Sequence, residues 1–320
     1  GVVLYYLSET EHAKLGHLVQ LKHHNPKQQV WMDRFTVRNL ELISPNAPEA
    51  ITLLEVVDHT ATAMGGRLLR RWITAPITDV ALIEKRLDVV RFFKEHPGLH
   101  QQVLSCLKEV TDIERLAAKV ATGRINPREV NALRLALMQT TTITGLLSDA
   151  DPVAPLLATI DESQAITNHI GTWLAAEAPT QLGKGQTIAA SVSAELDELR
   201  ALAQGGRNTL DAMLERESAR TGIPSLKIAF NNVFGYYIEV RNLHKDKVPE
   251  DWVRKQTLVN AERYITDELK TYETKILGAE ERIAVLEQQL FQELIVYLTP
   301  HIQSFQNTAR GIAQLDVLHG

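Results

Sequence analysis

The stretch that decides the fold is Asp267–Leu298, which reads DELKTYETKILGAEERIAVLEQQLFQELIVYL. Its apolar side chains recur every three or four residues, with Glu, Lys and Gln at many positions between them: Leu269, Tyr272, Ile276, Ala279, Ile283, Leu286, Leu290, Leu294 and Tyr297. This spacing predicts one long helix whose apolar seam packs along a partner rather than into a compact core. At 1.5 Å per residue, a helix of 32 residues would be about 48 Å long.

A second periodic stretch, Ile188–Arg220, is the predicted antiparallel partner of that helix. It contains Gly205-Gly206, where we expect a kink or a local break. Between the two stretches, Ser225–Val233 and Phe234–Leu243 alternate apolar and polar residues and predict a β-hairpin, to which Gln256–Val259 could add a third strand. The sequence therefore predicts a small β module inserted between two long helices.

The N-terminal half is predicted to be mostly helical, with Pro and Gly residues between the periodic stretches Ile51–Val57, Met64–Ile73, Ile83–Lys94, Val103–Val120 and Val130–Leu147. Before them, Val30–Leu42 alternates enough to predict a strand or two. The predicted fold class is mainly α, with a helical core, two long antiparallel helices and a small inserted antiparallel β module. The expected domains are a connector segment at 1–30, the core with the first long helix at 31–210, the β module with flanking helix ends at 211–265, and the second long helix returning to the core at 266–320.

Composition excludes several classes of protein. Of 320 residues, 44% are hydrophobic and 23% are charged, which is typical of a folded globular chain and not of a disordered one. The single cysteine, Cys106, excludes an intrachain disulfide and a four-cysteine zinc site. The sequence has no apolar run of about 18 residues, the length that would predict a membrane span. The chain begins without Met, on the apolar run Val2–Leu7, and is expected to be a segment of something longer.

The sequence offers no catalytic, cofactor or metal site. Gly183–Thr187 resembles a phosphate-binding loop, but Ala178 stands where its first glycine should be and Gly185 where Ser or Thr should follow the lysine. His23-His24 has no suitably spaced carboxylate to complete a metal site. No nucleophile elbow of the form G-x-S-x-G occurs. We therefore expect an ordinary turn at 183–187, no metal and no active site.

Charge is unevenly distributed along the chain. The stretch 227–263 has seven basic residues against five acidic ones, so it carries +2 and leaves −7 on the rest of a chain whose net charge is −5. Lys and Arg on a separate module, with polar residues among them, suit contacts to phosphate oxygens, which fix position without reading sequence. The alternative is that these residues are ordinary solvated loop charges.

Four segments resemble the DNA mismatch repair ATPases of the MutS family in their middle region. DRFTVRNLEL at 33–42 resembles the family's D-x-x-T-x-R-N-L-E-L, and MGGRLLRRW at 64–72 is similar to part of its T-x-x-G-x-R-L-L-R-x-W run. FNNVFGYYI at 230–238 resembles the F-N-x-x-x-G-Y-Y-I hairpin, and QTLVNAERY at 256–264 resembles Q-T-L-x-N-A-E-R-Y. All four occur in order across most of the chain.

This resemblance implies that the long helices are the family's levers and that the inserted module is the clamp that grips double-stranded DNA. On that basis, the residues expected to contact the DNA backbone are Lys227, Asn232, Lys245, Lys247, Arg254, Lys255 and Asn260. The family's ATPase and mismatch-binding domains are missing, so ATP and Mg are expected only in the longer parent. The resemblance also implies a homodimeric parent, a partner protein of the MutL type and a cytoplasmic, nucleoid-associated location.

Two alternatives remain open from the sequence. A pair of long helices could serve only as a coiled-coil scaffold that holds protein partners. The same architecture could also belong to a MutS-like protein of another DNA repair or recombination process. A phosphate-binding loop, G-x-x-x-x-G-K-[ST], downstream of this segment would support the ATPase parent.

Overall fold

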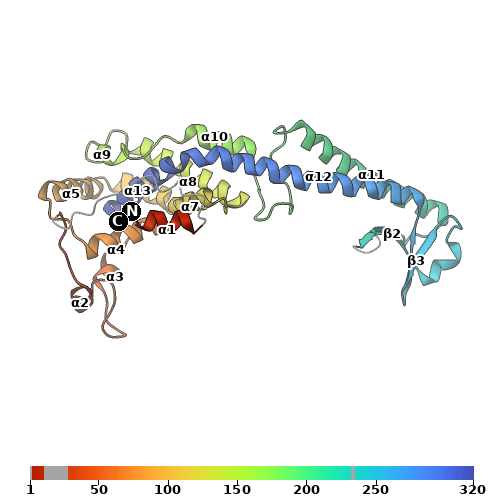
Figure 1. The fold of residues 1–320 in the computed structure, drawn as a ribbon, viewed down its shortest axis with the longest axis horizontal. Coiled ribbons are helices and arrows are strands. Elements are labelled where there is room, and N and C mark those ends of the chain that lie inside the picture. The colour runs from red at the N-terminus through yellow and green to blue at the C-terminus, as the bar shows by residue number, and fades with distance from the viewer. Residues whose placement is uncertain (1, 11–27, 232–234) are drawn as a thin grey trace. The chain divides into compact units, whose positions relative to one another are not determined.

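The computed structural model describes residues 2–10, 28–231 and 235–320, and the chain divides into two compact units. Unit 1 is Gly1–Thr187 with Phe291–Gly320, and unit 2 is Ile188–Leu290. Helices dominate the described residues, and their one sheet has four antiparallel strands within unit 2 (Figure 1). The predicted fold class, mainly α with long helices and a small antiparallel β module, is confirmed.

Unit 1 is built from short and medium-length helices. They are α1 (Val2–Glu9), α2 (Arg34–Asn39), α3 (Leu53–Val57), α4 (Ala63–Thr74), α5 (Val80–Glu95), α6 (Pro97–Glu109), α7 (Ile113–Thr122), α8 (Pro127–Leu146), α9 (Ala154–Leu157), α10 (Gln164–Trp173), the 3-10 turn η3 (Thr299–His301) and α13 (Ile302–His319). Helix α13 packs against α4, α5 and α7, and it buries Phe305, Ile312 and Leu315 completely. The core of unit 1 therefore joins the C-terminal helix to helices from the first half of the chain.

Side-chain caps explain where many of these helices begin. Asp79 and Asp112 accept hydrogen bonds from the backbone N–H groups of the first turns of α5 and α7. Asn126 and Glu129 form a reciprocal capping box at the start of α8. Gly123 ends α7 in the left-handed conformation, at φ 66°, that glycine adopts without strain. Local sequence therefore determines these boundaries.

A buried carboxylate connects α13 to the start of α4. Asp316 is fully buried, and its side chain accepts hydrogen bonds from the N–H of Ala61 at 2.8 Å, from the N–H of Thr62 at 2.8 Å and from the hydroxyl of Thr62 at 2.6 Å. A Cβ on Gly65 would lie 2.1 Å from Asp316 Oδ2. The first glycine of the MGGRLLRRW segment is therefore required because the carboxylate occupies the space of a side chain.

The strands predicted at Val30–Leu42 are wrong. Residues 34–39 form helix α2, which Asp33 caps by accepting a hydrogen bond from the N–H of Thr36 at 2.6 Å. The only pairing in this region among the described residues is an isolated bridge between Gln29 and Ile77. An N-cap aspartate stabilises a helix start locally, and this effect outweighs a short alternation of apolar residues.

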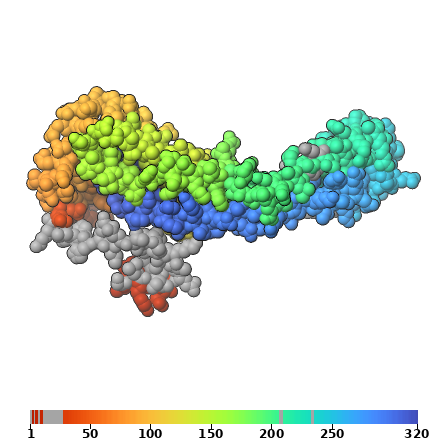
Figure 2. Space-filling view, turned by 90° about the horizontal axis from the view of Figure 1, so that it is seen from above, coloured from red at the N-terminus to blue at the C-terminus, as the bar shows by residue number. Residues whose placement is uncertain are grey.

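Unit 2 contains α11 (Ala194–Thr221) and most of α12 (Asp267–Leu298), whose bounds match the long predicted helix. Helix α11 is continuous through Gly205 and Gly206, so a local break there, one of the two expectations, is wrong. The two helices run antiparallel, because Arg200 pairs with Glu287 at 2.6 Å towards one end of α11 and Arg216 with Glu268 at 2.5 Å towards the other. Their side chains meet along the pair, α11 in green and α12 in blue (Figure 2).

Candidate nucleic-acid interface

The β module of unit 2 is a four-stranded antiparallel sheet in the order β1-β2-β4-β3. Its strands are β1 (Lys227–Asn231), β2 (Gly235–Arg241), β3 (Val253–Thr257) and β4 (Ala261–Ile265), and the 3-10 helix η2 (Asn242–Lys247) follows β2. The hairpin predicted from the sequence is confirmed as β1 and β2. Strand β3 overlaps the third predicted strand but begins earlier, and β4 was not predicted.

One face of the sheet packs on the two long helices. Ile238, Val240 and Tyr264 form a buried cluster with Trp252, with Leu210 and Met213 of α11, and with Leu269 and Ile276 of α12. The cluster contains side chains of β2, of β4 and of both helices, and the partly buried Ile228 of β1 packs against it. The sheet is therefore held rigidly by an apolar core of its own.

The hairpin turn is also attached to α12. Gly235 has a φ of +77°, and a Cβ at this position would lie 2.1 Å from the carboxylate of Glu273. That carboxylate accepts a hydrogen bond from the N–H of Tyr236 at 2.9 Å. Glycine is therefore needed here both for its backbone conformation and for the close approach of Glu273.

The two tyrosines after this glycine lie on opposite faces of β2, as expected from strand geometry. The Tyr236 ring packs beside Phe230, with ring centroids 5.2 Å apart. Tyr237 is only 6% exposed, and the guanidinium of Arg263 lies over its ring at 4.3 Å. Both rings therefore take part in packing within the module.

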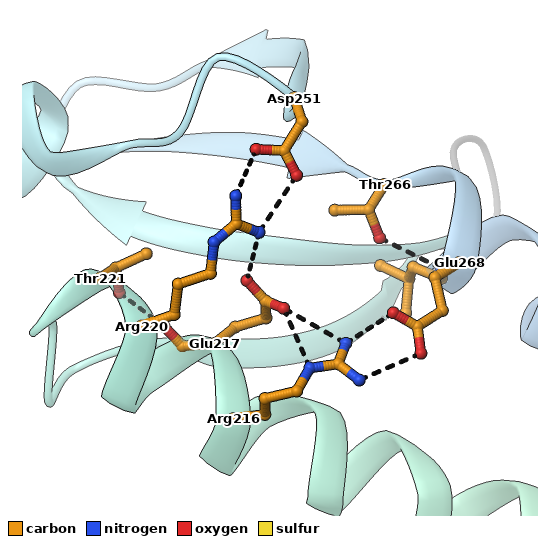
Figure 3. A network of polar contacts seen from close by, with 8 residues as sticks. Arg216, Glu217, Arg220, Thr221, Asp251, Thr266 and Glu268 are labelled. Carbon is orange, nitrogen blue, oxygen red and sulfur yellow. Dashed lines mark hydrogen bonds and ion pairs between the residues drawn. The ribbon is translucent and has the colours of Figure 1, made fainter.

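A network of charged side chains joins α11 to the start of α12 and to the segment before β3 (Figure 3). Glu217 is 5% exposed and pairs with Arg216 at 3.2 Å and with Arg220 at 3.3 Å. Arg216 also pairs with Glu268 at the start of α12, and Arg220 with Asp251 just before β3, at 2.7 Å. The hydrogen bond that Arg220 donates lowers the pKa of Asp251, and the hydrogen bonds that Arg216 donates to Glu268 and Glu217 raise the pKa of Arg216. The network thus fixes the sheet to both helices.

The predicted phosphate contacts are spread over the module: some lie on the two edge strands of the sheet and the others on η2 and in a turn. Lys227 is on edge strand β1, Arg254 and Lys255 are on edge strand β3, Lys245 and Lys247 are on η2, and Asn260 is in the turn between β3 and β4. Neighbouring strands are about 4.8 Å apart, so the two edges are separated by about 14 Å. Asn232 lies outside the described residues, as does the His23-His24 pair.

These side chains differ in their exposure and in whether an acidic residue pairs with them. The four lysines are exposed, and no described residue forms an ion pair with any of them. Arg254 instead pairs with Glu262 at 3.3 Å. Asn260 is exposed at its side chain, while its carbonyl accepts a hydrogen bond from the N–H of Asn242 at 3.1 Å. The lysines are therefore the most available cations of the predicted set.

The sequence did not point to Glu262, whose negative charge offsets that of Arg254. The Tyr264 hydroxyl donates a short hydrogen bond to it, and this bond, with the nearby charges of Arg254 and Lys245, lowers the pKa of Glu262 despite partial desolvation. Burial and the bond to Glu262 raise the pKa of Tyr264 to about 12. Arg241, exposed at the end of β2, was also left out of the predicted set, although the uneven charge distribution had marked it.

Other kinds of site receive little support within the described residues. No group of three His, Cys, Asp or Glu side chains in those ranges could hold a metal ion. Every helix there is too short or too polar to span a bilayer. Gly183 and Gly185 have φ values of +81° and +115°, which fits the turn expected at 183–187.

Comparison with known proteins identifies the family. The family model described as MutS domain III matches residues 35–320. The chain belongs to the MutS family. It is 49% identical over 320 residues to the DNA mismatch repair protein MutS of Flavobacterium psychrophilum and 50% identical to that of Christiangramia forsetii. The protein of the same name from Porphyromonas gingivalis is 48% identical.

The matches cover 99% of this chain but only 36–37% of those three MutS relatives, so the chain spans little more than a third of their length. The family resemblance inferred from the four sequence segments is thereby confirmed. In the MutS fold seen here, the first glycine of MGGRLLRRW makes room for Asp316, and the glycine of FNNVFGYYI makes room for Glu273. The QTLVNAERY segment runs from β3 through the turn into β4.

Proposed function

We propose that unit 2 grips the backbone of duplex DNA, without reading its sequence, as part of a DNA mismatch repair protein. The observation that carries this proposal is a set of exposed lysines on the sheet and on η2 that form no ion pair with any described residue: Lys227, Lys245, Lys247 and Lys255. Relatives that bear the name DNA mismatch repair protein support it. In this proposal the sheet is the clamp, and α11 and α12 are the levers.

The spread of these cations suits a duplex better than a small anion. Edges about 14 Å apart reach separate phosphates, because a groove of B-DNA is about 6 to 12 Å wide between its backbones. Four neutralised phosphates give a slope of about −3.6 for log affinity against log salt concentration. Binding should therefore weaken about 150-fold between 50 and 200 mM salt.

The helix pair is the proposed route by which DNA contact is coupled to the rest of the parent protein. Arg200 pairs with the almost fully buried Glu287, and Arg282 pairs with Glu195 at 2.8 Å. Cross-linked antiparallel helices resist sliding, so a rotation at one end is passed to the other as a rigid-body movement. The nucleotide site, with ATP and Mg, belongs in this proposal to the parent, as do a homodimer and a MutL-type partner.

The test is a fluorescence anisotropy titration of the chain with a perfectly paired and a mismatched duplex at several salt concentrations. We expect equal affinity for both duplexes, and in Lys245→Ala/Lys255→Ala a slope that is shallower by about 1.8. The matched control is Lys85→Ala/Lys94→Ala, which removes two exposed lysines of α5 in unit 1. Unchanged binding in the first variant would refute the proposed interface, and no binding at low salt would favour the scaffold alternative.

A further inference from the structure

Two aliphatic side chains at one end of the β module are exposed to an unusual degree. Val259 is 92% exposed and Leu243 is 86% exposed, the highest values for large apolar side chains in the described ranges. Single exposed apolar residues are common on protein surfaces and need no explanation. Here two such side chains come from different segments of the module that we propose to bind DNA, which suggests a shared role.

Hydrogen bonds from Asn242 hold the segment of Leu243 against the turn that contains Val259. The N–H of Asn242 donates to the carbonyl of Asn260 at 3.1 Å, and its side-chain amide donates to the carbonyl of Val259 at 2.8 Å. Leu243 follows Asn242 directly in η2, and the β3–β4 turn is closed by a bond from Leu258 to Ala261 at 2.8 Å. We name Leu243 and Val259 the apolar tip.

Three exposed cations lie near the apolar tip along the chain. Arg241 ends β2 two residues before Leu243, Lys245 follows Leu243 in η2, and Lys255 lies on β3 four residues before Val259. This charge favours an anionic partner over a second apolar protein surface, which would have to desolvate the same cations. A nucleic acid combines phosphate charge with adjacent apolar surface, because its sugar rings lie between successive phosphates.

We infer that the apolar tip packs against the deoxyribose surface of DNA beside the phosphates that the lysines contact. This inference rests on the proposed function and adds to it a contact that is neither ionic nor sequence-specific. Many proteins that bind the minor groove place apolar side chains against DNA, as wedges between base steps. Apolar contacts release no counterions, so this part of the affinity is independent of salt.

The test compares Leu243→Ser, Val259→Ser and the double variant with the unchanged chain in anisotropy titrations at several salt concentrations. Each single variant should bind about fivefold more weakly at every salt concentration, with the salt slope unchanged. Lys255→Ala should instead make the slope shallower by about 0.9. The matched control is Val296→Ser, which removes an apolar side chain that is 62% exposed on α12.

A second variant checks the position of the tip independently. Val259→Lys places a charge where Val259 stands, and next to DNA it should steepen the salt slope by about 0.9. Since both tip side chains are almost fully exposed, none of these variants should change the thermal unfolding midpoint.

The outcomes separate this inference from the function on which it rests. Serine variants that bind as tightly as the unchanged chain, while the lysine variants lose affinity, overturn the apolar tip and leave the clamp intact. Loss of self-association in sedimentation, with DNA affinity retained, assigns the tip to a second copy of the chain and also overturns the inference. If the unchanged chain fails to bind DNA, the proposed function and the inference are both wrong.

Discussion

Replacing Gly65 by alanine should destabilise unit 1, although the same change in the middle of a helix normally stabilises a protein. Alanine is favoured over glycine in a helix by about 1 kcal/mol. In α4, however, the added Cβ would lie 2.1 Å from Oδ2 and 2.8 Å from Cγ of Asp316. The sign of the effect therefore depends on whether that buried carboxylate can move.

The structure indicates that it moves only at a high cost. Oδ2 of Asp316 accepts hydrogen bonds from both the N–H and the hydroxyl of Thr62, and the side chain is fully buried. Hydrogen bonds to a charged group contribute about 1.5–3 kcal/mol each, so losing both costs about 3–6 kcal/mol. After the gain in helix propensity, we expect Gly65→Ala to lower the free energy of unfolding by about 2–5 kcal/mol.

The assay is urea denaturation followed by far-UV circular dichroism and by tryptophan fluorescence, which reports on Trp72 in the same helix. The control is Gly145→Ala in α8, where an added Cβ would meet nothing within 4 Å. That variant should be as stable as the unchanged chain, or up to about 1 kcal/mol more stable. If Gly65→Ala is also at least as stable as the unchanged chain, the argument from the Asp316 carboxylate is refuted.

Three further predictions concern charged side chains. Glu217→Gln should lower the urea midpoint of unit 2 more than Glu195→Gln does, because Glu217 is buried between two arginines whereas the Glu195 side chain is 53% exposed; equal midpoints would contradict this. Glu262→Gln releases Arg254 and should tighten DNA binding in anisotropy titrations while steepening its salt slope by up to about 0.9; weaker binding would count against the proposed interface. Burial lowers the pKa of His319, so this side chain binds a proton more tightly in the unfolded chain than in the folded one. The free energy of unfolding should therefore be highest above about pH 6.5 and should fall as the pH drops through the folded pKa. Urea denaturation of His319→Gln should show a flatter pH dependence.

The long helices and the hairpin could be predicted because their signals are local. The apolar seam of Asp267–Leu298 repeats with the helical period over the whole element, and the predicted bounds match α12. Strand β4 escaped prediction because its charged residues obscure the alternation of a strand. Glu262 of β4 pairs with Arg254 of β3, and Arg263 of β4 lies over Tyr237 of β2, contacts that exist only once the strands pair.

The candidate site was predicted as a set of residue types and not as an arrangement. The sequence indicated an excess of positive charge between the helices, and it marked residues that lie on the module. It did not show that Lys227 and Lys255 lie on opposite edges of the sheet, about 14 Å apart, or that Arg254 is already paired with a carboxylate. Pairing and spacing depend on strand order and register, which bring together residues far apart in the chain.

The sequence by itself determined the family, the helical class and the position of the inserted β module, because periodicity, capping residues and motifs act over a few neighbouring residues. Only the tertiary structure decided why Gly65 and Gly235 must be glycines, which cations are free, and that Leu243 and Val259 share one exposed tip. Each of these facts depends on contacts between segments that lie from about ten to more than two hundred residues apart in the chain. Such contacts follow from the packing of the whole chain and leave no local signal in the sequence.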